Sequence, residues 1–270
     1  PVSSETVVLG GDPCLKEVYA GKEYYFNEAG QLVMINVTAP IYPDALAKAL
    51  EAYAKAYEVD VKKTKVKDIN LGIETITNNY LDDAMSSYMF EDYAKASQLF
   101  GKAADASATE PYSKVDTTAL YNAGFTAWMM KDYPRAEEYF NKCVEAGYYY
   151  EGGEVFAKLA DIYNNTERKD VARDILESGF AKFPQSQSIL IGLINYYLES
   201  KQSPDRLFEL IGEAKKNEPN NASLYYVEGN IYSELGQKDK AVESYYKCAE
   251  IDPSYEFGFI GAGILYYNQA

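Results

Sequence analysis

The side chains that most often carry out catalysis are absent or poorly placed in this sequence. Histidine is missing altogether, which removes the commonest general base and the commonest metal ligand. Asp82 and Asp83 are adjacent, so on a helix they point to different sides and do not form an acid–base pair. The serines have no histidine partner or glycine elbow, and the sequence contains no Walker loop and no zinc-ligand spacing. We therefore expect a protein that is not an enzyme and that uses no metal or cofactor.

The three cysteines are Cys14, Cys143 and Cys248. Cys143 and Cys248 occupy the same position in a pattern that recurs along the chain, where other copies carry alanine or glycine. Each is therefore expected to be a small buried hydrophobic residue. The sequence has no disulfide framework, so the cysteines do not decide between an oxidising and a reducing compartment.

Aromatic side chains, by contrast, are abundant and regularly spaced. The chain has 27 tyrosines. Thr118, Tyr121, Phe125 and Trp128 follow one another at steps of three, four and three residues, which places them on one face of a helix. Tyrosine and tryptophan combine apolar area with a hydrogen-bonding group, which suits a binding surface. The alternative is that these rings pack on neighbouring helices.

The same face in the other copies of the pattern completes the set of candidate partner-binding residues. They are Tyr88, Tyr121, Phe125, Trp128, Tyr196, Tyr226 and Asn230. These residue types predict a groove that is aromatic in its N-terminal half and more polar toward its middle.

The elements that position this face are pairs of amphipathic helices. The small residue that opens each pair recurs every 34 to 40 residues, as Ala84, Gly124, Ala160, Asn195, Gly229 and Gly263. A small residue where two helices touch, followed by a ring where space remains, is typical of a helical hairpin. In 222–255, Gly236 is placed to end the first helix and Pro253 to stop the second.

Five copies in register resemble the tetratricopeptide repeat family over about residues 77–270. The resemblance implies an all-α fold, a right-handed solenoid of antiparallel helix pairs with about six repeats and a terminal helix. It implies a concave groove lined by the first helix of each pair, and a non-enzymatic scaffold that holds a protein or peptide. One binding mode of the family grips a C-terminal carboxylate with lysine, arginine and asparagine. The groove face here lacks lysine and arginine, and Lys158 and Asn122, which flank it, do not reproduce that set. We therefore do not expect this binding mode.

The repeat register divides the chain into segments. We expect a flexible start at 1–13, a degenerate repeat with an expanded turn at 14–60, a repeat with a long first helix at 61–110, further repeats at 117–150, 153–186, 188–221 and 222–255, and a half repeat or cap at 256–270. Gly21 and Tyr24 stand in the small-then-ring relation, which predicts a first helix over 14–29.

The net charge and the hydropathy of the chain restrict the classes of partner that we expect. Lys plus Arg number 26 against 41 Asp plus Glu, a net charge of −15. This balance argues against nucleic acid, whose phosphates need basic side chains, and against docking on anionic lipid. It leaves open a preference for a basic partner. No apolar run approaches the ~20 residues of a membrane span.

Two further expectations concern ligand and location. The tyrosines leave open an alternative function, a cell-envelope component that stacks glycans on exposed rings. Similar repeat proteins with an extended N-terminal unit occur in bacterial cell envelopes, and this resemblance favours a periplasmic or envelope location over the cytoplasm. The terminal segment, 256–270, is apolar on several sides, which predicts a missing capping helix or a homodimer through this C-terminal face.

Overall fold

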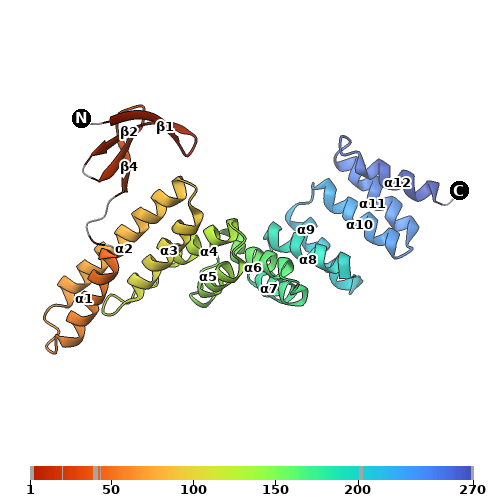
Figure 1. Cartoon of the computed structure of the whole chain (residues 1–270). Helices are drawn as coiled ribbons and strands as arrows, with labels where there is room; N and C mark the ends of the chain where they lie inside the picture. Colours follow the sequence, from red (N-terminus) through yellow and green to blue (C-terminus); the bar gives the residue numbers. More distant parts are fainter. Residues whose placement is uncertain (1–2, 20, 39–41, 43, 201–202, 269–270) are drawn as a thin grey trace. The chain divides into compact units, whose positions relative to one another are not determined.

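The computed structural model describes residues 3–19, 21–38, 42, 44–200 and 203–268. They belong to two compact units, 1–148 and 149–270. Figure 1 shows an N-terminal sheet followed by helices in succession. The strands are β1 (Ser3–Leu9), β2 (Asp12–Tyr19), β3 (Lys22–Phe26) and β4 (Leu32–Val37).

Helices make up the rest of both units. In the first unit they are α1 (Ala45–Val59), α2 (Val66–Met89), α3 (Tyr93–Ala108), α4 (Thr117–Met129) and α5 (Tyr133–Glu145). In the second they are the short 3-10 turn η1 (Glu151–Gly153), α6 (Glu154–Asn165), α7 (Lys169–Lys182), α8 (Gln187–Ser200), α9 (Pro204–Asn217), α10 (Ala222–Glu234), α11 (Lys238–Ile251) and α12 (Phe257–Tyr267). None of the described helices is long and apolar enough to cross a membrane.

The N-terminal segment differs from the sequence-based expectation. The flexible start predicted at 1–13 and the first helix predicted at 14–29 are both wrong, because these residues supply strands of an antiparallel sheet with the order β1-β2-β3-β4. Pro1 and Val2 lie outside the described residues. Of the degenerate repeat predicted at 14–60, only the second half is helical, as α1, which packs on α2.

These residues form strands because buried and exposed side chains alternate along them and because glycines stand at the turns between them. Cys14 is buried and Leu15 next to it is exposed, which is the alternation of a strand rather than the 3.6-residue period of a helix. Gly11, Gly21 and Gly30 stand between successive strands with φ values of 95°, 73° and 72°. Glycine adopts this left-handed conformation without steric cost, so Gly21 serves a hairpin turn instead of a helix contact.

One face of the sheet packs on the end of α2. Leu9, Cys14, Tyr25 and Met34 form a buried cluster against which Met89 packs. The ring of Phe90 meets the Tyr25 ring edge-on, with centroids 5.4 Å apart. Burial raises the pKa of the Tyr25 hydroxyl to about 12.

The rest of this face is polar. Glu23 accepts hydrogen bonds from Asn36 Nδ2 at 2.8 Å and from the Tyr25 hydroxyl at 2.9 Å, and it pairs with Lys16 Nζ at 3.0 Å. The Asn36 hydrogen bond and the Lys16 pair lower the pKa of Glu23 against the opposing effect of burial. The inner face is therefore held by a mixture of apolar packing and charge-assisted hydrogen bonds.

The predicted helix pairs are confirmed, and two of them, α4–α5 and α10–α11, close on a contact between a glycine and a ring. Phe140 of α5 packs over Gly124 of α4, where an added Cβ would lie 3.0 Å from the Phe140 ring. Tyr245 of α11 packs over Gly229 of α10, where a Cβ would lie 2.6 Å from the ring. Such close approach needs a residue without a side chain, so the glycines are required by packing.

The turn inside four of the pairs recurs as well, and the equivalent residue of the α8–α9 pair lies outside the described residues. Gly236 follows α10 with φ 71°, and the equivalent residues of earlier pairs are Glu91, Lys131 and Glu167, with φ near 60°. This is the left-handed residue that commonly ends an α-helix. Glycine suits it best, so three of the pairs carry backbone strain there.

Candidate functional site

The first helices of the first unit, α2 and α4, carry the N-terminal part of the predicted binding face. On α2, Met85 is 48% exposed and Tyr88 is half-buried. The Tyr88 ring meets the ring of Tyr93, at the start of α3, edge-on with centroids 5.5 Å apart. The end of α2 therefore presents an apolar side chain beside a positioned pair of tyrosines.

On α4 the predicted aromatic residues lie together. Phe125 stacks between Tyr121, at a centroid distance of 5.9 Å, and Trp128, at 6.0 Å. Phe125 and Trp128 are half-buried. The steps of four and three residues thus form a continuous aromatic row along one helix face.

Tyr121 is a correction to the sequence-based site. Its side chain is buried, with 6% exposure. Its ring also lies near Phe140 and Tyr148, with centroids 5.9 and 6.3 Å away. Tyr121 is therefore a core residue of the first unit, because a helix that is apolar on nearly every side is covered on more than one face.

In the second unit, Tyr196 of α8 is half-buried and bonded to α7. Its hydroxyl donates to Asp170 Oδ1 at 2.7 Å and accepts from Arg173 Nη1 at 3.2 Å. The hydrogen bond to Asp170 raises the pKa of Tyr196. Its ring remains at the surface while its hydroxyl holds α8 to α7.

Tyr226 and Asn230 of α10 both contact the helices that follow. Tyr226 lies among Tyr245, Tyr255 and Phe257, with centroid distances of 5.9, 6.3 and 5.6 Å. Asn230 Oδ1 accepts a hydrogen bond from the Tyr245 hydroxyl at 2.8 Å. These two residues are half-buried, so they bind neighbouring helices and offer only part of their surface to a partner.

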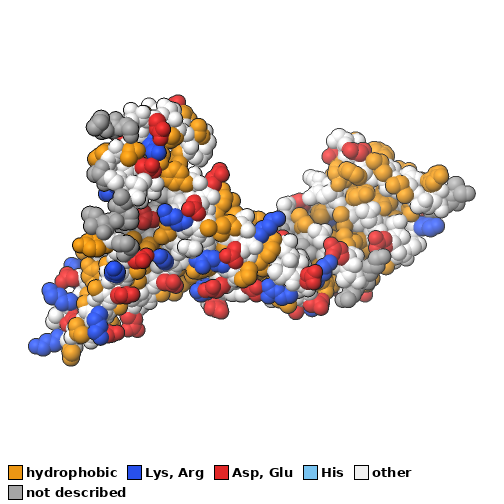
Figure 2. Space-filling view, in the orientation of Figure 1, with side chains coloured by type: hydrophobic (Ala, Val, Ile, Leu, Met, Phe, Trp, Pro, Cys, Tyr) orange, Lys and Arg blue, Asp and Glu red, His pale blue; other side chains and the backbone are white. Residues whose placement is uncertain are grey.

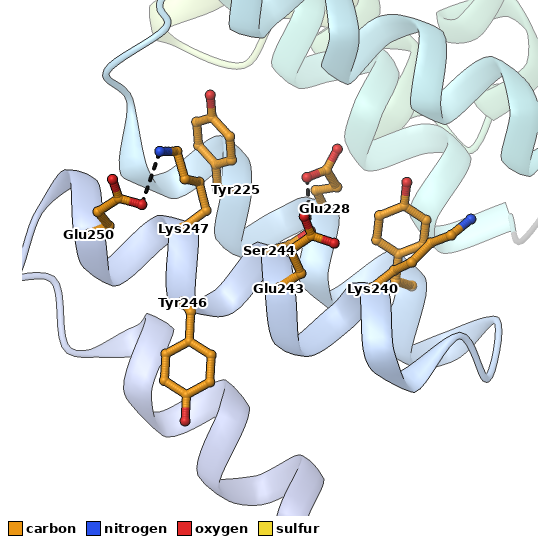
Figure 3. Close-up of a pocket in the computed structure, with 9 residues that line it drawn as sticks. Tyr225, Glu228, Lys240, Glu243, Ser244, Tyr246, Lys247 and Glu250 are labelled. Atoms are coloured by element: carbon orange, nitrogen blue, oxygen red, sulfur yellow. Dashed lines mark hydrogen bonds and ion pairs between the residues drawn. The ribbon is translucent and has the colours of Figure 1, made fainter.

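An open hollow of about 700 Å³ lies over α10 and α11 (Figure 3). Its α10 residues, Tyr225, Glu228 and Tyr232, lie on the side of that helix opposite Tyr226 and Asn230. The other lining residues are Lys240, Glu243, Ser244, Tyr246, Lys247 and Glu250. In Figure 3 Tyr246 points away from the other labelled side chains.

Glu228 is the centre of the polar contacts in this hollow. It pairs with Lys215 Nζ of α9 at 2.6 Å and accepts from the Ser244 hydroxyl at 2.9 Å. Lys215 also lies over the Tyr225 ring, 4.0 Å from its centroid. The ion pair is largely buried and links α9 to α10. The Glu228 carboxylate is therefore held in place by Lys215 and Ser244.

Sequence reasoning missed this arrangement, although a signal was present. Glu228 directly precedes the small residue of its repeat. The same position holds Ala123, Leu159 and Ile194 in other pairs, and all three are buried. Apart from Asp83 on α2, the other residues of this column are apolar, and a carboxylate among them indicates a buried polar contact.

The cysteines behave as expected for core residues. Cys14, Cys143 and Cys248 are free and buried. Burial raises the pKa of the Cys143 thiol to about 12, so the reactive thiolate is disfavoured. Within the described ranges, no group of three or more histidine, cysteine, aspartate or glutamate side chains is arranged to hold a metal ion.

Comparison with known sequences bears on the class of protein. The sequence model of the tetratricopeptide repeat family matches residues 117–146 and 222–255, which are the α4–α5 and α10–α11 pairs. No curated protein matches the chain significantly.

Comparison with solved structures bears on the fold. YrrB, described as a TPR protein with an unusual peptide-binding site, superposes with a TM-score of 0.52 at 19% identity, over 78% of this chain and 97% of YrrB. MamA superposes with a TM-score of 0.53 at 20% identity, over 66% of this chain and 92% of MamA. The pilF protein of Pseudomonas aeruginosa gives 0.50 at 11% identity, over 83% and 99%.

The fold is a succession of antiparallel helix pairs like those of solved tetratricopeptide-repeat proteins, with a small sheet before them. The two matched segments identify tetratricopeptide repeats in this chain, at 117–146 and 222–255.

Proposed function

We propose that this protein is a non-enzymatic scaffold that binds an extended peptide segment along the first helices of its first unit. The contact surface consists of Met85, Tyr88, Phe125 and Trp128. The observation that carries the proposal is the row of half-buried rings on α4, which continues a surface position that α2 fills with an exposed methionine. The peptide-binding site named for YrrB supports it as a precedent on the same fold.

The chemistry of this surface suits a peptide with apolar anchors. Aromatic rings and methionine provide adaptable apolar contact. Asn78 and Thr118 are exposed at equivalent positions of α2 and α4, and their amide and hydroxyl groups suit a peptide backbone, which needs hydrogen-bond partners when it leaves water. The net charge of −15 favours a peptide with basic residues beside its apolar anchors.

The test is a selection from a random peptide library displayed on phage, with the full chain as bait. Selected peptides are then measured by fluorescence anisotropy against wild type, Met85→Ala and Trp128→Ala. We expect each variant to weaken binding about tenfold, because central apolar anchors contribute most of the affinity of such surfaces. Tyr246→Ala removes an exposed ring of α11 and is the matched control, expected to bind like wild type.

Two results count against the proposal. One is a selection that yields no peptide above background. The other is a set of peptides whose affinity falls with Tyr246→Ala and not with Met85→Ala or Trp128→Ala. Circular dichroism of each variant shows that a loss of binding does not come from a loss of fold.

A further inference from the structure

The N-terminal sheet has a second face, which points away from its buried cluster. The strand register places Leu15 opposite Phe26, and Tyr24 opposite both Glu17 and Ile35. Residues directly opposite one another, or two apart on one strand, share a face. We name the following side chains the outer face: Ser4, Thr6, Val8, Pro13, Leu15, Glu17, Tyr19, Lys22, Tyr24, Phe26, Ile35 and Val37.

The outer face is largely apolar and exposed, with Ser4 and Thr6 of β1 as its uncharged polar residues. Exposure is 74% for Val8, 42% for Leu15, 51% for Tyr19, 39% for Ile35 and 45% for Val37. Tyr19 and Tyr24 stack at a centroid distance of 4.4 Å, which flattens this part of the surface. The inner face, in contrast, has Met89 of α2 and the following residue, Phe90, against it. A sheet normally buries one apolar face and leaves a polar face in water. This sheet buries an apolar cluster on its inner face and also leaves apolar side chains exposed on its outer face.

The area is sufficient for a specific contact. With whole side-chain areas of roughly 150–250 Å² for the larger residues, the exposed fractions correspond to on the order of 500 Å² of apolar surface. Two such faces together would bury about 1,000 Å², the size at which stable interfaces begin. Apolar patches larger than a few hundred Å² mark interaction sites.

The charges of this face favour a second copy of the chain. Glu17 and Lys22 are its charged residues, and they balance one another although the whole chain carries −15. A two-fold contact between identical faces is reciprocal, so that where residue i of one copy meets residue j of the second, residue j of the first also meets residue i of the second. Glu17 of one copy can then face Lys22 of the second, so the electrostatic repulsion between two acidic molecules is absent at this surface.

We propose that the outer face is an interface between two copies of this chain, with the sheets packed face to face as in a β-sandwich. This interface is separate from the first-helix surface that we assign to peptide binding. It is also separate from α12, whose exposed side chains form the hydrophobic area visible at the C-terminal end in Figure 2.

Sedimentation velocity of the full chain tests the proposal, at concentrations up to about 100 µM, which detects dimers of modest affinity. Wild type is expected to form a dimer, and Leu15→Lys is expected to raise the dimer dissociation constant at least tenfold. Leu71→Lys places the same charge at an exposed leucine of α2 and is expected to match wild type. Ile264→Lys, on α12, is expected to retain the dimer.

A charge exchange separates a lost contact from a damaged sheet. Glu17→Lys alone and Lys22→Glu alone are each expected to weaken the dimer, whereas the double exchange restores it, which an unfolded sheet does not do. A wild-type monomer throughout the concentration range overturns the proposal. So does a dimer that survives Leu15→Lys and dissolves in Ile264→Lys, since that result places the interface on α12.

Discussion

The helix pairs and the N-terminal sheet differ in how much of their apolar surface they bury. In the pairs, rings such as Phe140 and Tyr245 are buried on a glycine of the partner helix. In the sheet, the face that packs on α2 combines a buried apolar cluster with the ion pair of Lys16 and Glu23, and the face in water also carries apolar side chains. The pairs satisfy their own packing requirements, so their half-buried surface residues are available for partners. The sheet leaves apolar surface exposed, which association would cover.

The largest expected effect concerns the glycine contact within a pair. Gly229→Leu is expected to destabilise the fold by about 3 kcal/mol or more, because its first side-chain atom already lies 2.6 Å from the Tyr245 ring. Gly263 occupies the same position of the pattern on α12, and a Cβ there meets no atom within 4 Å. Gly263→Leu is therefore expected to raise stability by about 0.5–1 kcal/mol through helix propensity. Urea unfolding monitored by circular dichroism measures both, and equal effects would show that close packing does not distinguish the two positions.

A second prediction concerns the polar contacts that join α7, α8 and α9. Glu177 accepts from Arg206 Nη2 at 2.6 Å and from the Tyr197 hydroxyl at 2.9 Å. Burial opposes ionisation of Glu177, but the hydrogen bonds from Arg206 and Tyr197 outweigh it and lower its pKa. Glu177→Gln is expected to cost about 1–2 kcal/mol at neutral pH. Glu209→Gln, which removes a more exposed partner of the same arginine, is expected to cost less than about 0.5 kcal/mol.

The pH dependence follows from the direction of that shift. A carboxyl whose pKa is lowered on folding stabilises the fold above its ordinary value of about 4.3. The contribution disappears as the pH falls through the lowered pKa of the folded state. Unfolding of wild type and Glu177→Gln should therefore differ at neutral pH and converge in strong acid. A constant difference across this range would mean that the Glu177 charge does not stabilise the contact.

The smallest expected effect concerns the turn within each pair. Gly236 and Glu167 are equivalent residues with φ values of 71° and 59°. Gly236→Ala is expected to cost about 1 kcal/mol, because a side chain is strained in this conformation. Glu167→Gly is expected to gain about 0.5 kcal/mol, since relief of strain exceeds the added freedom of the unfolded chain. Thermal unfolding of the two variants measures the pair, and the same sign in both would contradict the equivalence of the turns.

The sequence predicted the helix pairs because several columns recur together. Gly124, Gly229 and their ring partners hold the same spacing in independent copies, and chance does not reproduce such a register. At the N-terminus a single small-then-ring step, Gly21 and Tyr24, outweighed the two-residue alternation that begins at Cys14. One matched step does not define a repeat, whereas glycines between short alternating segments indicate hairpins.

The candidate site was predicted less well for a different reason. Periodicity places Tyr121 and Phe125 on one side of α4, but it does not show how deeply each ring is covered. Coverage depends on residues distant in sequence, such as Phe140 and Tyr148, which bury the Tyr121 ring. The contact of Lys215 with Glu228 was missed for a similar reason. It joins side chains of two successive repeats, and the recurring pattern does not show which side chains meet between repeats.

Hydrogen–deuterium exchange of the full chain, alone and saturated with a selected peptide, tests the division of roles most directly. Binding slows the exchange of amides whose opening it suppresses. The account predicts slower exchange in α2 and α4 and unchanged exchange in β2, β3 and β4. Slower exchange in the strands, with α2 and α4 unchanged, would contradict it, because the peptide would then occupy the sheet face that we assign to a second copy of the chain.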